Sequence, residues 1–569
     1  MSSSKIVDPG SVVADACRAT ARAAAALRWV ERPGYFTRRD PVDRGRVALL
    51  SGGGSGHEPL HSGFVGAGML DAAVPGAVFT SPNSLAIEAA TRAVDGGAGV
   101  VHVVKNYTGD VINFGVAADL CRADGIDVET VLVDDDVATD SSGSDGPGRR
   151  GTAATVVVEK LCGAAAARGD DLTAVADLGR RVAAASRSMA VAFRACTVPG
   201  ASSPSFELGD DEVEVGVGIH GERGTARANT LTAREVVDTL LDPVLSALDA
   251  GDGDDVLLVV NGLGGTHALE IAVVFGDALD ALAARGVRVR RHLVGTYVTA
   301  FDMAGVSLTV VRCGPDLPTD DVLALWDAPT AAPAWPHAPA RELHSDSVVD
   351  GERPSDTPGS ASGDDGEPDP VVTAWITGFT ERVRDAVDEL TELDRRAGDG
   401  DFGVTMEAGL RDAPDASSAL SAGAMFSALS RSFLENAGGT SGALFGAVFH
   451  RLADGLAGRD VDADTVADAV RGALEIVMRL GGADPGDRTM VDALAPAADA
   501  LHGARTDSLA AALTAAADAS ARGAERTAGM TARRGRASYV GDAARDVVDP
   551  GALAVAWFFA AGAEAAAAS

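Results

Sequence analysis

The sequence contains few cysteines, few lysines and few aromatic residues for a chain of 569 residues. Its five cysteines are odd in number, scattered and never spaced as C-x-x-C, which argues against a disulfide framework and against a zinc site. We expect most of them to be small buried side chains. They are Cys17, Cys121, Cys162, Cys196 and Cys313.

Positive charge is also scarce, because lysine occurs only at Lys5, Lys105 and Lys160 and the formal net charge is -34. So acidic a chain repels nucleic acid and anionic membrane surfaces, and we expect neither as a partner. No run of about 18 uncharged apolar residues predicts a membrane span. The first twenty residues also lack the basic-then-apolar pattern of a signal peptide. We therefore expect a cytoplasmic protein.

Strand-like and helix-like segments alternate from about residue 12 to residue 326. Runs such as VVHVVK (100–105) and DVLLVVNG (255–262) are rich in valine, and several of the strand-like runs are continuously apolar, as in strands covered on both faces. Alanine-rich segments with helical periodicity lie between them. This pattern predicts an N-terminal α/β domain over 1–326, which we expect to comprise two α/β subdomains.

The composition changes after residue 326. Residues 327–370 are rich in Pro, Ser, Gly and Asp without periodicity, which predicts a flexible linker. Beyond it, strand-like runs nearly vanish, and segments such as VADAVRGALEIVMRL (466–480) place their apolar residues on one helical face. We predict an all-α domain over 371–569 with six to eight helices in a bundle or barrel.

A glycine-rich segment, SGGGSGHEPLHSGFVG (51–66), follows a strand-like run. No lysine stands where a P-loop needs one, and the G-x-G-x-x-G spacing of a dinucleotide loop fails at Pro59. The remaining interpretations are a loop that presents His57, Glu58 and His61 to a polar or carbonyl-bearing ligand, and a merely flexible turn.

Two further segments of the α/β domain place polar groups where strands end. VVKNYTGDVINFG (103–115) carries Lys105 and Asp110 at the position where α/β sheets usually build their sites. GVGIHGERG (216–224) fits G-x-G-x-x-G formally but does not open a helix at once, so we do not interpret it as a dinucleotide loop. His220, amid these glycines, is either structural or a nucleophile toward carbonyls, since unprotonated imidazole can attack them near neutral pH.

In the helical domain, three aspartates are separated by glycines in LDRRAGDGDFG (393–403): Asp394, Asp399 and Asp401. Hard carboxylate oxygens on a turn suit Mg²⁺. The spacing of these aspartates alone does not establish a metal site, because D-G-D also occurs at 252–254, where we expect a solvated turn.

A second glycine-rich loop, NAGGTSGALFG (436–446), opens a predicted helix. Its free amides and the hydroxyls of Thr440 and Ser441 would form an anion cradle, although tight helix packing would also explain its small residues. GDRTMVDAL (486–494) offers Arg488 to a phosphate and Met490 to an adenine face, unless it is an ordinary basic patch. A chelated cation beside an anion cradle describes a metal-nucleotide site.

Taken together, these segments resemble the dihydroxyacetone kinase family in its single-chain, ATP-dependent form. The resemblance covers nearly the whole chain except the linker, and it rests on the motifs quoted above together with VNGLGGT (260–266), GTYVTAFDMAGVSLT (295–309) and GRASYVGDAARDVVDPGA (535–552). It implies a kinase that phosphorylates dihydroxyacetone or a similar short ketose from Mg-ATP.

The resemblance also implies roles for individual residues. His220 would attack the ketone carbon to form a covalent hemiaminal, and Asp110 would act as acid or base toward the hydroxyl that accepts phosphate. With His57 these form the implied catalytic set, and the substrate would also meet Gly53, Gly54 and Lys105. Asp394, Asp399 and Asp401 would bind Mg²⁺. The implied nucleotide contacts are Thr405, Gly438, Gly439, Thr440, Ser441, Gly442, Arg488, Thr489, Met490, Asp549 and Gly551.

The resemblance further implies a homodimer in which one chain's helical domain can serve the partner's sugar site. The chain departs from the family pattern at Phe402, where many relatives carry histidine, at Thr440, where serine is common, and at His267, which replaces a frequent proline and receives no role. The alternatives are a kinase for erythrulose, glyceraldehyde or another short carbonyl sugar, and, in a different class, a non-catalytic sensor of such sugars. The aspartate triad argues against a sensor, which needs no metal-nucleotide site.

Overall fold

The computed structural model describes residues 7–140, 148–336, 367–415, 417–533 and 546–569. The chain divides into two compact units, Met1–Val349 and Asp350–Ser569. Most of the predicted linker lies outside the described residues. Its first part, 327–336, packs on the first unit, because Ala332 and Trp335 are buried in that unit's core.

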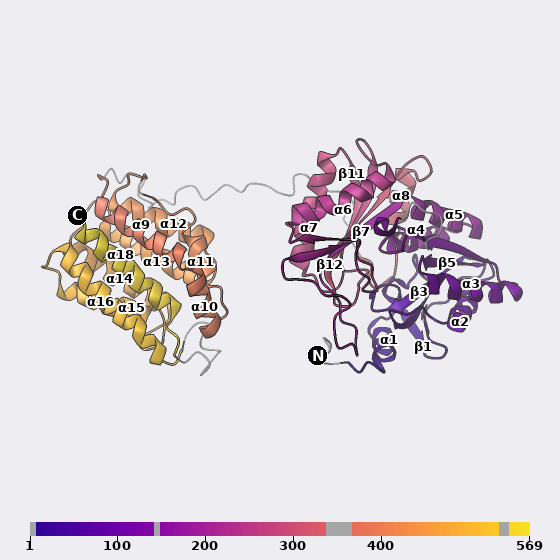
Figure 1. Ribbon diagram of the computed structural model, residues 1–569, viewed down its shortest axis with the longest axis horizontal. Coiled ribbons are helices and arrows are strands. Elements are labelled where there is room, and N and C mark those ends of the chain that lie inside the picture. Colours follow the sequence, from indigo (N-terminus) through magenta and orange to yellow (C-terminus); the bar gives the residue numbers. More distant parts are fainter. Residues whose placement is uncertain (1–6, 141–147, 337–366, 416, 534–545) are drawn as a thin grey trace. The chain divides into compact units, whose positions relative to one another are not determined.

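The first unit contains a six-stranded sheet of order β1-β2-β4-β3-β5-β6, of which β1, β3 and β5 are labelled in Figure 1. Strands β3, β4, β5 and β6 pair in parallel, whereas β1 and β2 add antiparallel pairings at one edge. Neighbouring residues Leu49 and Leu50 of β3 belong to different core clusters, so both faces of the sheet are covered as predicted. The strands are β1 (Leu27–Val30), β2 (Tyr35–Arg38), β3 (Ala48–Ser55), β4 (Ala72–Val78), β5 (Val100–Lys105) and β6 (Val128–Val133).

Helices cover this sheet on its two faces. On one side α2 and α3 pack with Leu50, and on the other α4 and α5 pack with Leu49. The elements of this part are α1 (Val12–Ala23), η1 (Ser62–Phe64), α2 (Ser84–Val94), α3 (Thr108–Ala123), η2 (Val137–Thr139), α4 (Ala154–Arg168) and α5 (Leu172–Ala184).

A second six-stranded sheet has the order β11-β10-β12-β7-β8-β9, in which only the β10–β11 pairing is parallel among the described strands. Helices α6 and α7 cover one face, while α4 contacts both β7 and β12 as well as the first sheet. Nearly every residue of α4 is therefore buried. The elements are β7 (Ser186–Arg194), β8 (Glu212–Val215), β9 (Ala226–Asn229), α6 (Ala233–Leu248), β10 (Asp255–Gly262), α7 (Ala268–Ala284), β11 (Arg288–Gly295), β12 (Ala304–Arg312) and α8 (Thr319–Trp326).

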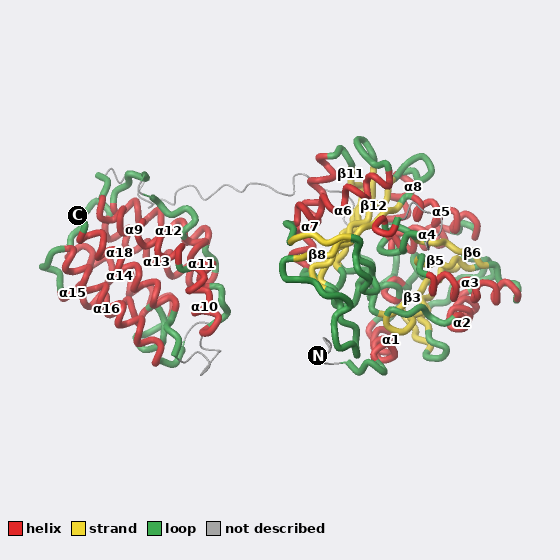
Figure 2. The backbone as a smooth tube through the Cα atoms, viewed as in Figure 1, coloured by secondary structure: helices red, strands yellow, loops and turns green. Residues whose placement is uncertain are grey.

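The second unit is all-helical in its described residues (Figure 2). These residues form nine α-helices, more than the six to eight predicted, because the short α10 and α11 on either side of the aspartate loop are separate helices. They are α9 (Pro370–Asp385), α10 (Val387–Ala397), α11 (Phe402–Gly409), α12 (Ala422–Asn436), α13 (Gly439–Leu456), α14 (Ala463–Gly481), α15 (Val491–Gly503), α16 (Leu509–Arg526) and α18 (Pro550–Ala567), with η3 at Thr527–Gly529.

Helix α18 is long and apolar enough to cross a membrane by length and composition alone. However, 67% of it is buried inside the unit, where it packs against α9 and α16. Burial among other helices therefore accounts for its composition.

Candidate functional site

In the first unit, the side chains singled out in the sequence gather at the carboxyl ends of β3 and β5. His57 follows β3, Lys105 ends β5, and Asp110 lies in the first turn of α3. His220 arrives from the loop between β8 and β9 of the second sheet. The ends of neighbouring parallel strands meet at one sheet edge, which brings His57 close to Lys105 and Asp110 although they are separated in sequence.

The imidazole of His220 is enclosed by other rings and is 17% exposed. Its ring centroid lies 4.3 Å from that of Tyr107, 4.7 Å from that of His57 and 5.6 Å from that of Phe79, all edge-on. Sequence analysis did not find Tyr107 or Phe79, because nothing in their spacing relates them to position 220.

The His220 loop is held by Glu222. One carboxylate oxygen of Glu222 accepts the backbone N–H of His220 at 2.8 Å, and the other lies 3.4 Å from His220 Nδ1. Burial opposes ionisation of Glu222, but the contacts with His220 and the charge of Arg150 outweigh it and lower its pKa to about 2. The ionised carboxylate favours a proton on Nδ1 of His220, which leaves Nε2 as the nitrogen with a lone pair.

His57 is fully buried, and its Nδ1 lies 2.7 Å from the carbonyl oxygen of Thr299. Since a carbonyl only accepts, Nδ1 carries the proton. Burial lowers the pKa of His57 well below its usual value, and the charges of His220 and Lys105 add to that shift. Nε2 of this neutral ring is buried and finds no hydrogen-bond partner among the described residues.

Lys105 and Asp110 are buried beside each other, with 3.8 Å between Nζ and Oδ2. Burial lowers the pKa of Lys105, against the opposing charges of Asp110 and Glu159. The other oxygen of Asp110, Oδ1, is buried and has no hydrogen-bond partner in the described part of the chain. A buried acceptor without a partner costs about 1–3 kcal/mol, so Oδ1 is ready to receive a donor from a ligand.

The glycines of β3 allow close packing against neighbouring backbone as well as space for a ligand. A Cβ on Gly52 would lie 2.5 Å from the Val74 carbonyl oxygen, and one on Gly54 would lie 2.6 Å from the Thr80 nitrogen. Only Gly53 faces the polar cluster, where a Cβ would lie 2.3 Å from Lys105 Nζ. Close backbone packing thus explains part of the glycine run, and Gly53 alone keeps room at the candidate site.

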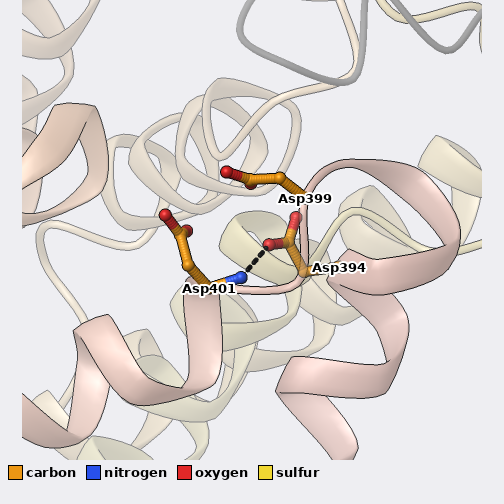
Figure 3. A group of neighbouring side chains, drawn as sticks. All are labelled: Asp394, Asp399 and Asp401. Atoms are coloured by element: carbon orange, nitrogen blue, oxygen red, sulfur yellow. Dashed lines mark hydrogen bonds between the residues drawn. The ribbon is translucent and has the colours of Figure 1, made fainter. Parts of the chain in front are cut away.

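In the second unit, Asp394, Asp399 and Asp401 converge as predicted (Figure 3). Each offers one carboxylate oxygen, and these oxygens lie within 4.8 Å of one another. Asp394 also fixes the loop, because its Oδ2 accepts backbone N–H groups from Gly400 at 2.9 Å, Asp401 at 2.9 Å and Phe402 at 3.1 Å. Burial and the neighbouring Asp394 raise the pKa of Asp401, as expected where carboxylates lie close together.

The triad opens into a cavity of about 450 Å³. Every predicted nucleotide contact except Gly442 lines it, including residues from the α13 N-terminus, the turn before α15 and the start of α18. Gly442 is a packing position, since a Cβ there would lie 2.1 Å from the Ala437 carbonyl oxygen. The glycine loop does open a helix, because Gly438 is the N-cap of α13.

Apolar side chains also line this cavity, among them Leu444, Phe445 and Val477, and sequence analysis gave none of them a place at a ligand site. Phe402 lines it too, but is only 5% exposed and packs against Phe445 with 6.3 Å between ring centroids. Its departure from the family pattern therefore gives the cavity an aromatic wall instead of a polar group.

Two residues of the cavity carry strain or an altered charge state. Arg488 adopts a φ of 61°, which L side chains rarely take, and donates from Nη2 to the Val547 carbonyl oxygen at 2.8 Å. Asp549 caps α18 by accepting the Ala552 N–H at 2.8 Å, and burial raises its pKa to about 6 despite that bond and the charge of Arg488.

Comparisons with known proteins match both units. The Dak1 domain family matches residues 18–334, and the DAK2 domain family matches residues 396–564. Triokinase/FMN cyclase of Bos taurus is 40% identical over 533 residues, covering 90% of each chain. L-erythrulose 1-kinase of Mycolicibacterium smegmatis is 38% identical, covering 92% of this chain and 93% of its own.

Among solved structures, the dihydroxyacetone kinase of C. freundii in complex with AMP-PNP and Mg²⁺ is similar to this chain. It is 31% identical with a TM-score of 0.63, over 99% of this chain and 100% of its own.

Proposed function

We propose that this chain, which belongs to the single-chain DAK family and is an ATP-dependent kinase of small carbonyl sugars, phosphorylates dihydroxyacetone held as a covalent hemiaminal on His220. One observation carries the proposal: His220 packs against His57, whose buried Nε2 has no partner among the described residues, and Asp110 Oδ1, buried beside Lys105 in the same group of side chains, has none there either. A short polyol with a carbonyl supplies an electrophile for the first and hydroxyl donors for the others.

In the proposed adduct, His220 Nε2 forms a bond to the ketone carbon, and the carbonyl electron pair moves to oxygen. That oxygen gains a proton while the imidazolium gives up its Nδ1 proton beside Glu222, so the adduct carries no net charge. An alcohol such as glycerol has no carbonyl and cannot form this bond. Covalent attachment would then fix the acceptor hydroxyl for transfer, which is mostly a matter of positioning.

Asp110 would take the proton of that hydroxyl through Oδ1, while Lys105 beside it would donate to a sugar oxygen. His57, with its proton fixed on Nδ1 by Thr299, would accept a hydroxyl hydrogen at Nε2. Gly53 would leave the space above Lys105 open.

The DAK2 unit would hold Mg-ATP. The three carboxylates fit Mg²⁺, because they supply hard oxygen ligands from one short loop and leave the rest of the coordination to phosphate and water. When bound there, Mg²⁺ would neutralise triphosphate charge. The α13 N-terminus, with Thr440 and Ser441, would receive phosphate oxygens, and Arg488 would add a fixed positive charge. Met490 and the apolar wall around Phe445 would receive the adenine.

Transfer requires the two units to meet over the sugar, within one chain or between the two chains of a homodimer, the assembly that we propose for a cytoplasmic enzyme. The adduct demands only a carbonyl, so erythrulose and glyceraldehyde are alternative substrates, and the similarity to an L-erythrulose 1-kinase favours testing them. A sugar sensor without activity would have no use for the carboxylate triad beside a cavity of about 450 Å³.

The substrate is tested by measuring ADP release with Mg-ATP and a panel of dihydroxyacetone, erythrulose, glyceraldehyde and glycerol. We expect turnover with the carbonyl compounds, highest kcat/KM with dihydroxyacetone, and none with glycerol. Binding of a sugar without ADP release would support the sensor instead. Equal turnover with glycerol would contradict the adduct.

Gly53→Ala tests the open space in the sugar site. A Cβ at 2.3 Å from Lys105 Nζ must displace the ammonium, and we expect a loss of about tenfold or more in kcat/KM for dihydroxyacetone. The KM for Mg-ATP should not change. Gly115→Ala in α3 is the matched control, because no atom lies within 4 Å of its Cβ and alanine favours the helix. Unchanged sugar kinetics in Gly53→Ala would show that Lys105 does not act at this site.

A further inference from the structure

Behind the proposed sugar site, Lys105 continues into a buried chain of polar groups that the mechanism above does not use. Lys105 Nζ lies 2.7 Å from His61 Nε2, and His61 Nδ1 lies 2.6 Å from Glu159 Oε1. All three side chains are essentially inaccessible, at 0%, 5% and 0% exposure for the residues in that order. Three titratable groups in one line inside the core are costly unless they serve one another.

The partners fix the direction of each hydrogen bond. An ammonium only donates, so Lys105 donates to His61 Nε2, and His61 then carries its proton on Nδ1 and donates to the Glu159 carboxylate. Ser51 Oγ supports this arrangement, because it donates to the Val103 carbonyl oxygen at 2.7 Å and lies 2.9 Å from His61 Nδ1 with a lone pair to offer. In this arrangement the row Lys105–His61–Glu159 holds one positive and one negative charge, bridged by a neutral imidazole. Burial opposes both charges: it raises the pKa of Glu159 to about 8 and lowers that of Lys105, and the attraction between the two acts against both shifts.

These hydrogen bonds also determine the direction in which the Lys105 ammonium points its N–H groups. Two of its N–H groups are taken by His61 Nε2 and by the Gly52 carbonyl oxygen at 3.2 Å. The third remains on the side of Asp110, whose Oδ2 lies 3.8 Å away. Without an acceptor at His61, the flexible lysine side chain would keep only the longer bond to the Gly52 carbonyl oxygen and the contact with Asp110, so this rotation of the ammonium would be held less firmly.

We propose that His61, backed by Glu159, is a positioning residue that aims the third N–H of Lys105 at the sugar and supplies a counter-charge for it. This inference rests on the proposed function, since it assigns Lys105 to sugar binding. The pair would set affinity for the sugar and would leave the nucleotide unit untouched.

Two substitutions of His61 separate its two bonds. In His61→Gln the amide reaches the place of Nε2 and can still accept from Lys105. In His61→Asn it reaches only the place of Nδ1, so the bond to Lys105 is lost. We expect His61→Asn to raise the KM for dihydroxyacetone about tenfold, the effect of one charge-assisted hydrogen bond, while kcat falls less than about threefold. His61→Gln should recover most of the affinity, and the KM for Mg-ATP should stay constant in both.

The control is His102→Asn, which makes the same change in a fully buried histidine of β5, the strand that ends in Lys105. His102 Nε2 lies 2.9 Å from Thr91 Oγ1, and its ring packs against Phe114 with 5.5 Å between centroids, so its contacts differ from those of His61. The His102→Asn variant should have a lower unfolding temperature than the wild type and an unchanged KM for the sugar. Glu159→Gln, which keeps the shape and an acceptor but removes the charge, provides a second variant should His61→Asn fail to fold, and it should also raise the sugar KM.

Equal effects of His61→Asn and His102→Asn on the sugar KM would overturn the inference, as would failure of His61→Gln to restore affinity. An unchanged KM for the sugar in a folded Glu159→Gln protein would show that Glu159 has no part in positioning Lys105. Wild-type protein that phosphorylates no carbonyl sugar would instead refute the proposed function, and the two failures are therefore distinguishable.

Discussion

Replacing His220 with alanine is expected to remove ketose phosphorylation while leaving nucleotide binding intact. The covalent adduct would supply most of the positioning of the acceptor hydroxyl, and losing it should lower kcat/KM for dihydroxyacetone by about 10³-fold. Steady-state kinetics measure the loss, and calorimetric titration with Mg-ATP measures the binding that should remain. His220 lies in the Dak1 unit and the nucleotide cavity in the other, so the two readouts are independent.

His292→Ala is the matched control for that experiment. His292 lies on β11, where its ring packs against Phe275 with 4.9 Å between centroids, and it takes no part in the cluster around His220. We expect its activity to equal that of the wild type. A His220→Ala protein with wild-type kcat/KM would contradict the covalent adduct.

Neutralising two of the three aspartates of the triad is expected to cause the second largest loss of activity. Asp399→Asn and Asp401→Asn remove carboxylate charge where a cation would bind and leave the Asp394 hydrogen bonds to the loop intact, and we expect activity to fall about 10³-fold in the double variant. Binding of Mg-ATP by titration calorimetry should weaken with it. Chelation of Mg²⁺ from the wild type should stop turnover, and added Mg²⁺ should restore it.

The second D-G-D segment provides the control, because Asp252→Asn changes an exposed aspartate in the turn before β10. Its kinetics should match those of the wild type. Asp394→Asn is less informative, since its Oδ2 holds three backbone N–H groups and its loss would disturb the loop itself. Full activity in the double variant would place the cation elsewhere.

The long valine-rich strands and the glycine loops were predictable because their signals are local. Strands β5 and β10 are rich in valine and buried along nearly their whole length, and the aspartate and glycine loops of the helical unit both lie at helix termini as their residues indicate. Strand β4 was missed for an equally local reason: Pro75 and Gly76 argue against a strand. This segment is nevertheless a strand because it pairs with the glycine-rich backbone of β3, where Pro75 lies opposite Gly53.

The parts of the site that sequence analysis missed depend on contacts between distant segments. Tyr107 and Phe79 enclose His220 from more than a hundred residues away. Glu159 reads as part of an ordinary helix, and only the packing of α4 between two sheets brings it to His61. The apolar wall of the nucleotide cavity follows helical periodicity and cannot be told from core by pattern alone.

The most direct measurement is a crystal structure of the protein soaked with dihydroxyacetone. We predict continuous density from His220 Nε2 to the central carbon of the sugar, with sugar hydroxyls within hydrogen-bond distance of Asp110 Oδ1 and His57 Nε2. A sugar bound elsewhere, with the His220 imidazole turned away from it, would contradict the account.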